Sequence, residues 1–236
     1  MKHLTKPVFD ALPFYLPPLD EQRKIAAVLD KVSDLIAKRR QQLDKLDTLV
    51  KARFVEMFGD VNSSRYPIVN LVDIAEDIFA GGDKPADVSL TKDDTYKYPV
   101  YANGYEKQGF QCYAKTYKIA KAAVTISARG TIGYCFIREP FFTPVVRLIT
   151  VVPDGKISIM YLKYAIDSIN FEISGTSQAQ LTVPDFKKKR IVLPPVDIQD
   201  QFSSFVTQVD KSKLSIQKSC EKLETLKKAL MQQYFG

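Results

Sequence analysis

Apolar residues recur every seven positions along two long stretches of the chain, residues 20–59 and 193–236. This spacing is typical of long helices that pair through one apolar seam. The seam positions are Leu29, Ile36, Leu43 and Val50 in the first stretch, with Leu46 on the adjoining seam, and Val209, Ile216, Leu223 and Leu230 in the second. Helices in a globular core rarely exceed about 25 residues, which disfavours the alternative of two amphipathic helices lying on a core. We therefore predict two long helices.

The two stretches are copies of one segment. Leu16-Pro17-Pro18 opens the first and Leu193-Pro194-Pro195 opens the second, 177 positions later, and the same offset relates Phe58-Gly59 to Phe235-Gly236. An internal repeat fixes architecture more firmly than any local signal. Because a single compact segment separates the copies, its two ends must lie close together. We therefore expect the helices to pair as an antiparallel coiled coil.

The segment between the helices, residues 60–192, has a different pattern. Its β-branched and aromatic runs at 98–102, 123–127 and 134–137 are separated by the turn signals Asn103-Gly104, Arg129-Gly130 and Asp154-Gly155. These features predict a mostly-β domain that contains one helix at about 158–169 and a second at 71–79. The predicted fold class is α+β, with one mostly-β domain flanked by the two helices.

Composition narrows the function. The 45% hydrophobic and 26% charged residues among 236 are ordinary for a soluble globular protein. Three scattered cysteines support neither a disulfide framework nor a zinc site, so a reducing cytoplasm fits best. No apolar run is long enough to span a membrane.

The net charge of +7 is concentrated in one region. Residues 95–150 hold eight lysines and arginines against two glutamates. This excess indicates a face that binds a polyanion, although a solvated basic surface would have the same composition.

Three short segments of the middle domain suit contacts to DNA. The turn at 81–85 offers backbone amides and Lys84 to a phosphate, and Arg129 and Thr131 lie at a predicted hairpin tip. The polar segment 174–180 is rich in amides, and glutamine can pair with adenine. The predicted DNA-contact residues are Lys84, Tyr101, Asn103, Lys107, Arg129, Thr131, Ser177, Gln178 and Gln180. A plain turn, a surface arginine, a flexible linker and tyrosines packed in a sheet are the alternative interpretations.

Several of these motifs together resemble one family. They are the helix start Leu-Pro-Pro-Leu-Asp-Glu-Gln at 16–22, the sequence Lys-Leu-Glu-Thr-Leu-Lys at 222–227, the Gly-Gly-x-x-Pro turn at 81–85 and Ser-Gly-Thr-Ser-Gln at 174–178. Over nearly its whole length the chain resembles the specificity subunits of type I restriction-modification systems. Full-length members carry two target recognition domains that alternate with two long spacer helices, so this chain resembles a half-length subunit with one recognition domain.

The resemblance implies an organisation and a set of partners. Residues 1–19 are expected to be the tail of an upstream recognition domain, 20–59 the first spacer helix, 60–192 the target recognition domain and 193–236 the second spacer helix. The implied function is sequence-specific binding of double-stranded DNA at a bipartite target, on behalf of methyltransferase subunits and, through them, restriction subunits. Two copies are expected to form a homodimer.

No catalysis, metal or cofactor is expected of the chain itself. Its only histidine is His3, and the sequence contains neither a phosphate-binding Gly-x-x-x-x-Gly-Lys-Ser/Thr loop nor the Asn/Asp-Pro-Pro-aromatic motif of methyltransferases. Other hypotheses stay open: a coiled-coil scaffold that binds no DNA, a truncated donor cassette without independent activity, or an enzyme that uses scattered carboxylates.

Overall fold

The computed structural model describes residues 6, 17–171 and 180–235. It forms two compact units, one made of residues 1–47 with 210–236 and the other of residues 48–209. The predicted tail at 1–19 lies almost wholly outside the described residues.

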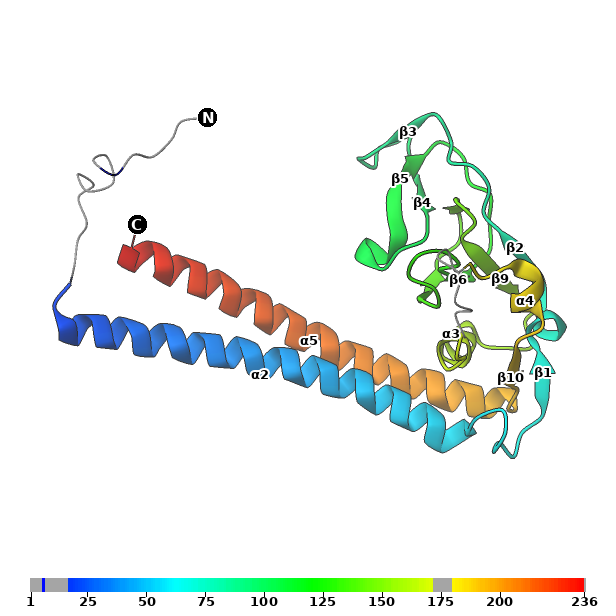
Figure 1. Ribbon diagram of the computed structural model, residues 1–236, viewed down its shortest axis with the longest axis horizontal. Helices are drawn as coiled ribbons and strands as arrows, with labels where there is room; N and C mark the ends of the chain where they lie inside the picture. Colours follow the sequence, from blue (N-terminus) through cyan, green and yellow to red (C-terminus); the bar gives the residue numbers. More distant parts are fainter. Residues whose placement is uncertain (1–5, 7–16, 172–179, 236) are drawn as a thin grey trace. The chain divides into compact units, whose positions relative to one another are not determined.

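The first unit is built from two 40-residue helices, α2 (Leu19–Phe58) and α5 (Val196–Phe235), which run side by side and continue into the second unit (Figure 1). Each helix begins after a Pro-Pro pair, which cannot donate the backbone hydrogen bonds of a preceding turn. The side chain of Gln22 donates to the Pro17 carbonyl at 2.7 Å, and that of Gln199 donates to the Pro194 carbonyl at 2.8 Å. The same side-chain hydrogen bond therefore forms at the start of both copies of the repeat.

Apolar and charged contacts join the helices within the first unit. Val32 and Ile36 of α2 pack with Cys220 of α5, and Leu223 and Leu230 lie against this cluster. Arg40 pairs with Glu224 at 2.8 Å, and Lys213 pairs with Asp47. Rising residue numbers on α2 meet falling numbers on α5, so the pairing is antiparallel. The predicted α+β fold with an antiparallel helix pair is confirmed.

The predicted seam positions differ in burial. Ile36, Val50 and Val209 are buried, whereas Leu29, Leu43, Leu46, Ile216, Leu223 and Leu230 are partly buried. The pair also includes charged side chains: Lys213 contacts Asp47 across the helices, and only 16% of the Lys213 side chain is exposed.

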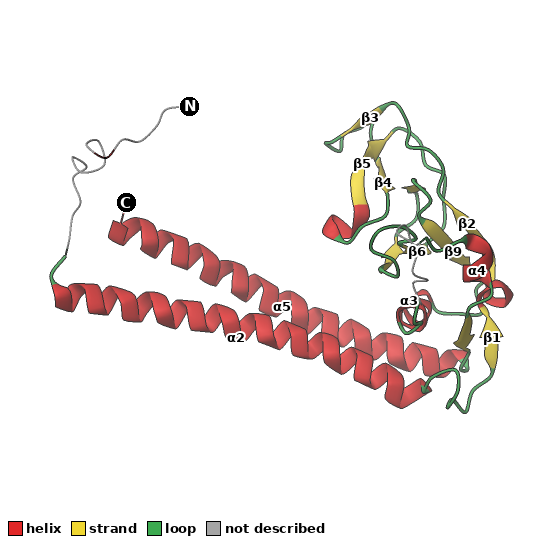
Figure 2. Cartoon of the chain, viewed as in Figure 1, coloured by secondary structure: helices red, strands yellow, loops and turns green. Residues whose placement is uncertain are grey.

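The second unit contains most of its strands in two sheets (Figure 2). One sheet has the order β2-β9-β6-β7, formed by Ala75–Ala80, Ile149–Pro153, Ala123–Ile126 and Cys135–Arg138, all antiparallel. The other has the order β3-β5-β4-β8, formed by Val88–Ser89, Phe110–Ala114, Tyr98–Tyr101 and Thr143–Pro144, with β4 and β8 parallel. A third, two-stranded sheet pairs β1 (Ile68–Asn70) with β10 (Arg190–Val192). Two short helices, α3 (Ile159–Asp167) and α4 (Val183–Lys187), complete the unit with the 3-10 turns η1 (Leu71–Ile74) and η2 (Glu106–Gly109).

One predicted helix is confirmed and the other is wrong. Helix α3 occupies the predicted segment and begins directly after Ser158. The segment 71–79 instead forms the η1 turn followed by strand β2. Leu71 and Ile74 are buried at a spacing that fits a helix or a 3-10 turn equally well. From Ala75 onward, pairing with β9 decides the conformation, and Ile78 lies opposite Val151.

An aromatic cluster within the second unit joins the helix ends to α3. The rings of Phe58 and Tyr161 lie 4.8 Å apart, and those of Phe54 and Phe202 lie 5.4 Å apart. The Tyr161 hydroxyl donates to the Val192 carbonyl at 2.6 Å, and burial raises its pKa. Helix α3 also packs on β6 and β7. The cluster therefore ties the β-rich part of this unit to the bases of α2 and α5.

Candidate nucleic-acid interface

One asparagine side chain connects three loops of the second unit. Asn103, after β4, donates through Nδ2 to the Val146 carbonyl at 2.6 Å and accepts from the Ala128 amide through Oδ1 at 2.8 Å. The neighbouring Gly104 amide donates to the Ser127 hydroxyl at 2.9 Å. These bonds bring the loops that follow β4, β6 and β8 together. Because both polar atoms of Asn103 are occupied, its geometry suits holding the loops rather than reading a base.

The Gly-Gly turn supports the third of these loops. Gly81 donates to the Leu148 carbonyl and accepts from the Arg147 amide, both at 2.9 Å. A Cβ added at Gly81 would lie 2.5 Å from the Pro144 carbonyl carbon, so only glycine permits this approach. The Gly81 amide expected to meet a phosphate is thus used within the fold, whereas Lys84 beyond it is exposed.

Two of the loops hold consecutive residues in the left-handed backbone region. Lys107 and Gln108 have φ of 47° and 55°, and Val146 and Arg147 have φ of 52° and 60°. Such a conformation costs free energy in residues other than glycine, and it concentrates at functional sites. The side chains of Lys107 and Arg147 are exposed at these positions. Arg147 is not among the DNA-contact residues predicted from the sequence. The left-handed conformation of Val146 and Arg147 has no signal in the local sequence.

An exposed aromatic pair lies on the same set of loops. Tyr105 is 62% exposed and Tyr134 is 42% exposed, and their ring centroids are 4.8 Å apart. Exposed aromatic faces can stack on bases or pack on sugars. Sequence reasoning attributed the tyrosines of this region mainly to sheet packing, so it missed this pair.

The structure brings two predicted contact residues together from distant parts of the sequence. Arg129 forms an isolated antiparallel bridge with Gln180, and the Leu181 amide donates to the Ala128 carbonyl at 2.9 Å. Arg129, Thr131 and Gln180 are all exposed. Ser177 and Gln178 lie outside the described residues.

Tyr101 is half-buried, unlike these exposed residues. Its half-buried ring lies 3.7 Å from the Arg138 guanidinium carbon, and it contacts the rings of Phe110 and Phe142 at 6.1 Å. Burial lowers the pKa of Arg138 to about 10, which leaves this residue charged at neutral pH. Tyr101 therefore suits a role in packing around a buried cation.

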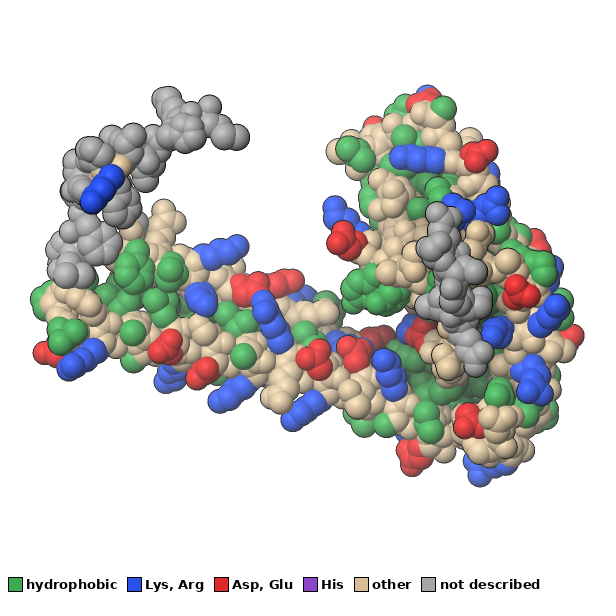
Figure 3. Space-filling model, viewed as in Figure 1, with side chains coloured by type: hydrophobic (Ala, Val, Ile, Leu, Met, Phe, Trp, Pro, Cys, Tyr) green, Lys and Arg blue, Asp and Glu red, His purple; other side chains and the backbone are tan. Residues whose placement is uncertain are grey.

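Not every basic residue of the 95–150 region is available to a polyanion. Lys115 pairs with Asp87 at 2.6 Å, Lys121 pairs with Glu76 at 2.5 Å, and Arg138 is buried. Five basic residues of the region are exposed and form no ion pair with any described residue: Lys97, Lys107, Lys118, Arg129 and Arg147. Figure 3 shows lysine and arginine side chains spread over the visible face of the β-rich unit. Five of the eight basic residues of the 95–150 region are therefore available to a polyanion.

Within the described ranges, no group of three or more histidine, cysteine or acidic side chains is arranged to hold a metal. None of the described helices combines the length and apolar character needed to cross a membrane.

Comparison with known proteins decides the family. A family model for the type I restriction modification DNA specificity domain matches residues 1–47 and 66–228. The chain belongs to this family. The match includes most of both helices and the β-rich segment between them, and it confirms the resemblance found in the sequence motifs.

Two Mycoplasma pneumoniae proteins named as type I specificity subunits are similar to this specificity-domain chain. S.MpnORF507P is 32% identical over 203 residues, which cover 85% of this chain and 56% of that protein. S.MpnORF89P is 33% identical over 210 residues, which cover 83% of this chain and 62% of that protein. The chain therefore spans somewhat more than half the length of these relatives.

Solved specificity subunits share the fold. The HsdS subunit from Thermoanaerobacter tengcongensis matches with a TM-score of 0.59 and 19% identity, over 93% of this chain and 59% of that one. The type I S subunit from M. genitalium matches with a TM-score of 0.64 and 17% identity, over 92% of this chain and 61% of that one. This chain and the solved subunits thus share an architecture in which long helices flank a mostly-strand unit.

Proposed function

We propose that this chain is a sequence-specific DNA-binding specificity subunit of a type I restriction-modification system, which directs methyltransferase and restriction subunits to a bipartite target. The observation that carries the proposal is the convergence of exposed cations and an aromatic pair on loops joined by Asn103, within a member of the DNA specificity family. The segment 60–192 would be the target recognition domain, and the helices would be its spacers.

The contact residues would divide into two groups by chemistry. Lys84, Lys107 and Arg147 are exposed cations suited to phosphates, which position a protein on DNA without reading its sequence. Arg129, Thr131 and Gln180 are exposed, and a backbone bridge places Arg129 beside Gln180. Arginine can pair bidentately with guanine, and glutamine with adenine. Ser177 and Gln178 would extend the base-reading group. The chain itself would contribute no catalytic group.

Binding to pooled random duplexes tests this function against a scaffold that binds no DNA. Repeated selection with the parent chain should enrich one motif. Lys107→Ala should weaken binding to all duplexes alike, whereas Arg129→Ala should reduce discrimination at one position by about 1–3 kcal/mol. Lys115→Ala is the matched control, since Lys115 is already paired with Asp87. Enrichment of no motif, or identical behaviour of the Lys107 and Arg129 variants across the panel, would contradict the proposal.

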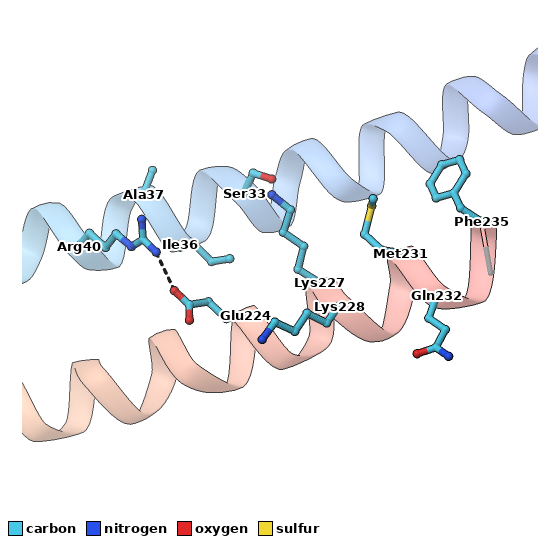
Figure 4. Close-up of a pocket in the computed structure, with 10 residues that line it drawn as sticks. All are labelled: Ser33, Ile36, Ala37, Arg40, Glu224, Lys227, Lys228, Met231, Gln232 and Phe235. Carbon is cyan, nitrogen blue, oxygen red and sulfur yellow. Dashed lines mark hydrogen bonds and ion pairs between the residues drawn. The ribbon is translucent and has the colours of Figure 1, made fainter. Parts of the chain in front are cut away.

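A second copy of the chain would supply the second recognition domain needed to read a bipartite target. We assign a groove in the first unit as the surface that binds this second copy. The groove, of about 810 Å³, lies between α2 and α5 and is lined by Ile36, Met231 and Phe235 with Arg40 and Glu224 (Figure 4). Hydrophobic side chains gather where α2 begins and α5 ends (Figure 3).

The internal repeat supports an interface at this groove. Met231 and Phe235 are the counterparts of Phe54 and Phe58, 177 positions earlier. Phe54 and Phe58 are covered in the second unit, with 6% and 2% of their surface exposed, whereas Met231 and Phe235 are 44% and 61% exposed. Positions that are buried in one copy of the repeat are open in the other. We propose that a second copy of the chain covers them.

A further inference from the structure

Arg138 is a buried arginine of one large sheet. It contacts the loop of the other large sheet that holds the left-handed residues Lys107 and Gln108. Arg138 on β7 is 3% exposed, and no described carboxylate forms an ion pair with it. Its Nε donates to the Thr125 hydroxyl at 2.8 Å, and its Nη2 donates to the Gln108 carbonyl at 2.5 Å. A buried charge is costly unless its donors are satisfied, so these contacts and the Tyr101 ring offset the cost of burial.

The contact with Gln108 joins the two large sheets. Arg138 belongs to the sheet of β2, β9, β6 and β7, whereas the loop that contains Gln108 connects β4 with β5 of the other sheet. Local backbone bonds also shape this loop: the Gln108 amide donates to the Tyr105 carbonyl at 2.9 Å, and the Ala102 amide donates to the Gly109 carbonyl at 2.8 Å. The bond from Arg138 fixes the loop against the rest of the unit.

The loop needs such support because of its backbone conformation. Lys107 and Gln108 are both left-handed, and two consecutive residues of this kind persist only when their surroundings hold them. The carbonyl that Arg138 grips belongs to the second of these residues, directly after Lys107. A change in that peptide would redirect the exposed Lys107 side chain.

We propose that Arg138 is a positioning residue for DNA binding, which holds the Lys107–Gln108 pair so that Lys107 meets a phosphate. Arg138 itself touches no DNA. The proposal rests on the proposed function, because it requires Lys107 to face the duplex.

The salt dependence of binding tests this role. Each phosphate contact contributes about −0.9 to the slope of log K against log salt concentration. With the full chain and a pooled random duplex, Lys107→Ala should lower the magnitude of the slope by about one and the affinity by roughly fivefold. Arg138→Met should produce the same change although Lys107 is present. The double variant should lose no further slope, since both changes remove one contact.

Two further variants separate positioning from general stability. Glycine adopts the left-handed region readily, so Gln108→Gly should restore at least half of the slope lost in Arg138→Met. Arg138→Lys keeps the charge but lacks the fork that reaches both Thr125 and Gln108, so its slope should fall between those of the parent and Arg138→Met. Slopes are compared below the unfolding temperature of each variant.

Three results would overturn the inference: a parent-like slope in Arg138→Met, a further loss of slope in the double variant, or no recovery with Gln108→Gly. If Arg138→Met does not fold, Arg138→Lys decides the question, and a parent-like slope and affinity in that variant would overturn the inference. An unchanged slope in Lys107→Ala would instead contradict the proposed DNA face. If the slope falls in Lys107→Ala but stays parent-like in Arg138→Met, only the role of Arg138 would be contradicted.

Discussion

Replacing Phe58 with alanine is expected to lower the free energy of unfolding by about 3–5 kcal/mol, the usual cost of removing a buried aromatic ring. Phe58 is 2% exposed, and its ring lies within 4.8–5.5 Å of the rings of Phe54, Tyr161 and Phe202. The cavity would open where the base of α2 meets α3 and α5.

Urea denaturation followed by circular dichroism measures this loss. Val55→Ala is the matched control, since Val55 is three residues away on the same helix and 61% exposed. Its unfolding free energy should change by less than about 1 kcal/mol. Equal midpoints for the Phe58 and Val55 variants would show that the aromatic cluster does not hold the helix bases to the β-rich part of the unit.

Replacing both Met231 and Phe235 with serine is expected to separate a dimer into monomers. Loss of a well-packed aromatic anchor from an interface commonly costs 2 kcal/mol or more, which is about a thirtyfold change in dissociation constant. With both side chains changed, the dissociation constant should rise by at least about a hundredfold. Sedimentation equilibrium at micromolar concentration would show the parent as a dimer and the variant as a monomer.

Leu226→Ser is the control for this experiment, because Leu226 lies on the same helix and is 46% exposed, close to the 44% of Met231. It does not line the groove. A parent that stays monomeric, or a Met231/Phe235 variant that dimerises like the parent, would contradict the assignment of the groove to a second copy. Neither result would bear on whether the proposed recognition domain binds DNA.

The helical part of the fold was predictable because its signals are long and redundant. The seven-residue spacing, the absence of interior proline and glycine, and the repeated Pro-Pro starts all indicate the same two elements, which are α2 and α5. Strand β4 and the turn at Asn103-Gly104 were also predictable from local sequence, and Gly104 has a φ of 133°. The segment 71–79 was not, because its conformation is decided by pairing with β9.

The candidate site was only partly predictable, because burial and long-range contacts reassign residue types. Arg138 counts as a surface cation in the sequence, yet it is buried against Tyr101. Asn103 has the chemistry to read a base, yet its amide joins two other loops. The adjacency of Arg129 and Gln180 arises from a bridge across 51 positions of sequence, which no local pattern indicates.

The most direct test of the account is the pattern of methylated bases produced by a partner methyltransferase subunit with and without this chain. Co-expression in a host free of that methylation, followed by sequencing of modified bases, should reveal one bipartite motif of two inverted half-sites separated by a fixed gap. The motif should be absent without the chain and, in Arg129→Ala, degraded at one position of each half-site. Methylation that is missing in both cases, or that follows the same motif with and without the chain, would contradict the claim that this chain sets the sequence read.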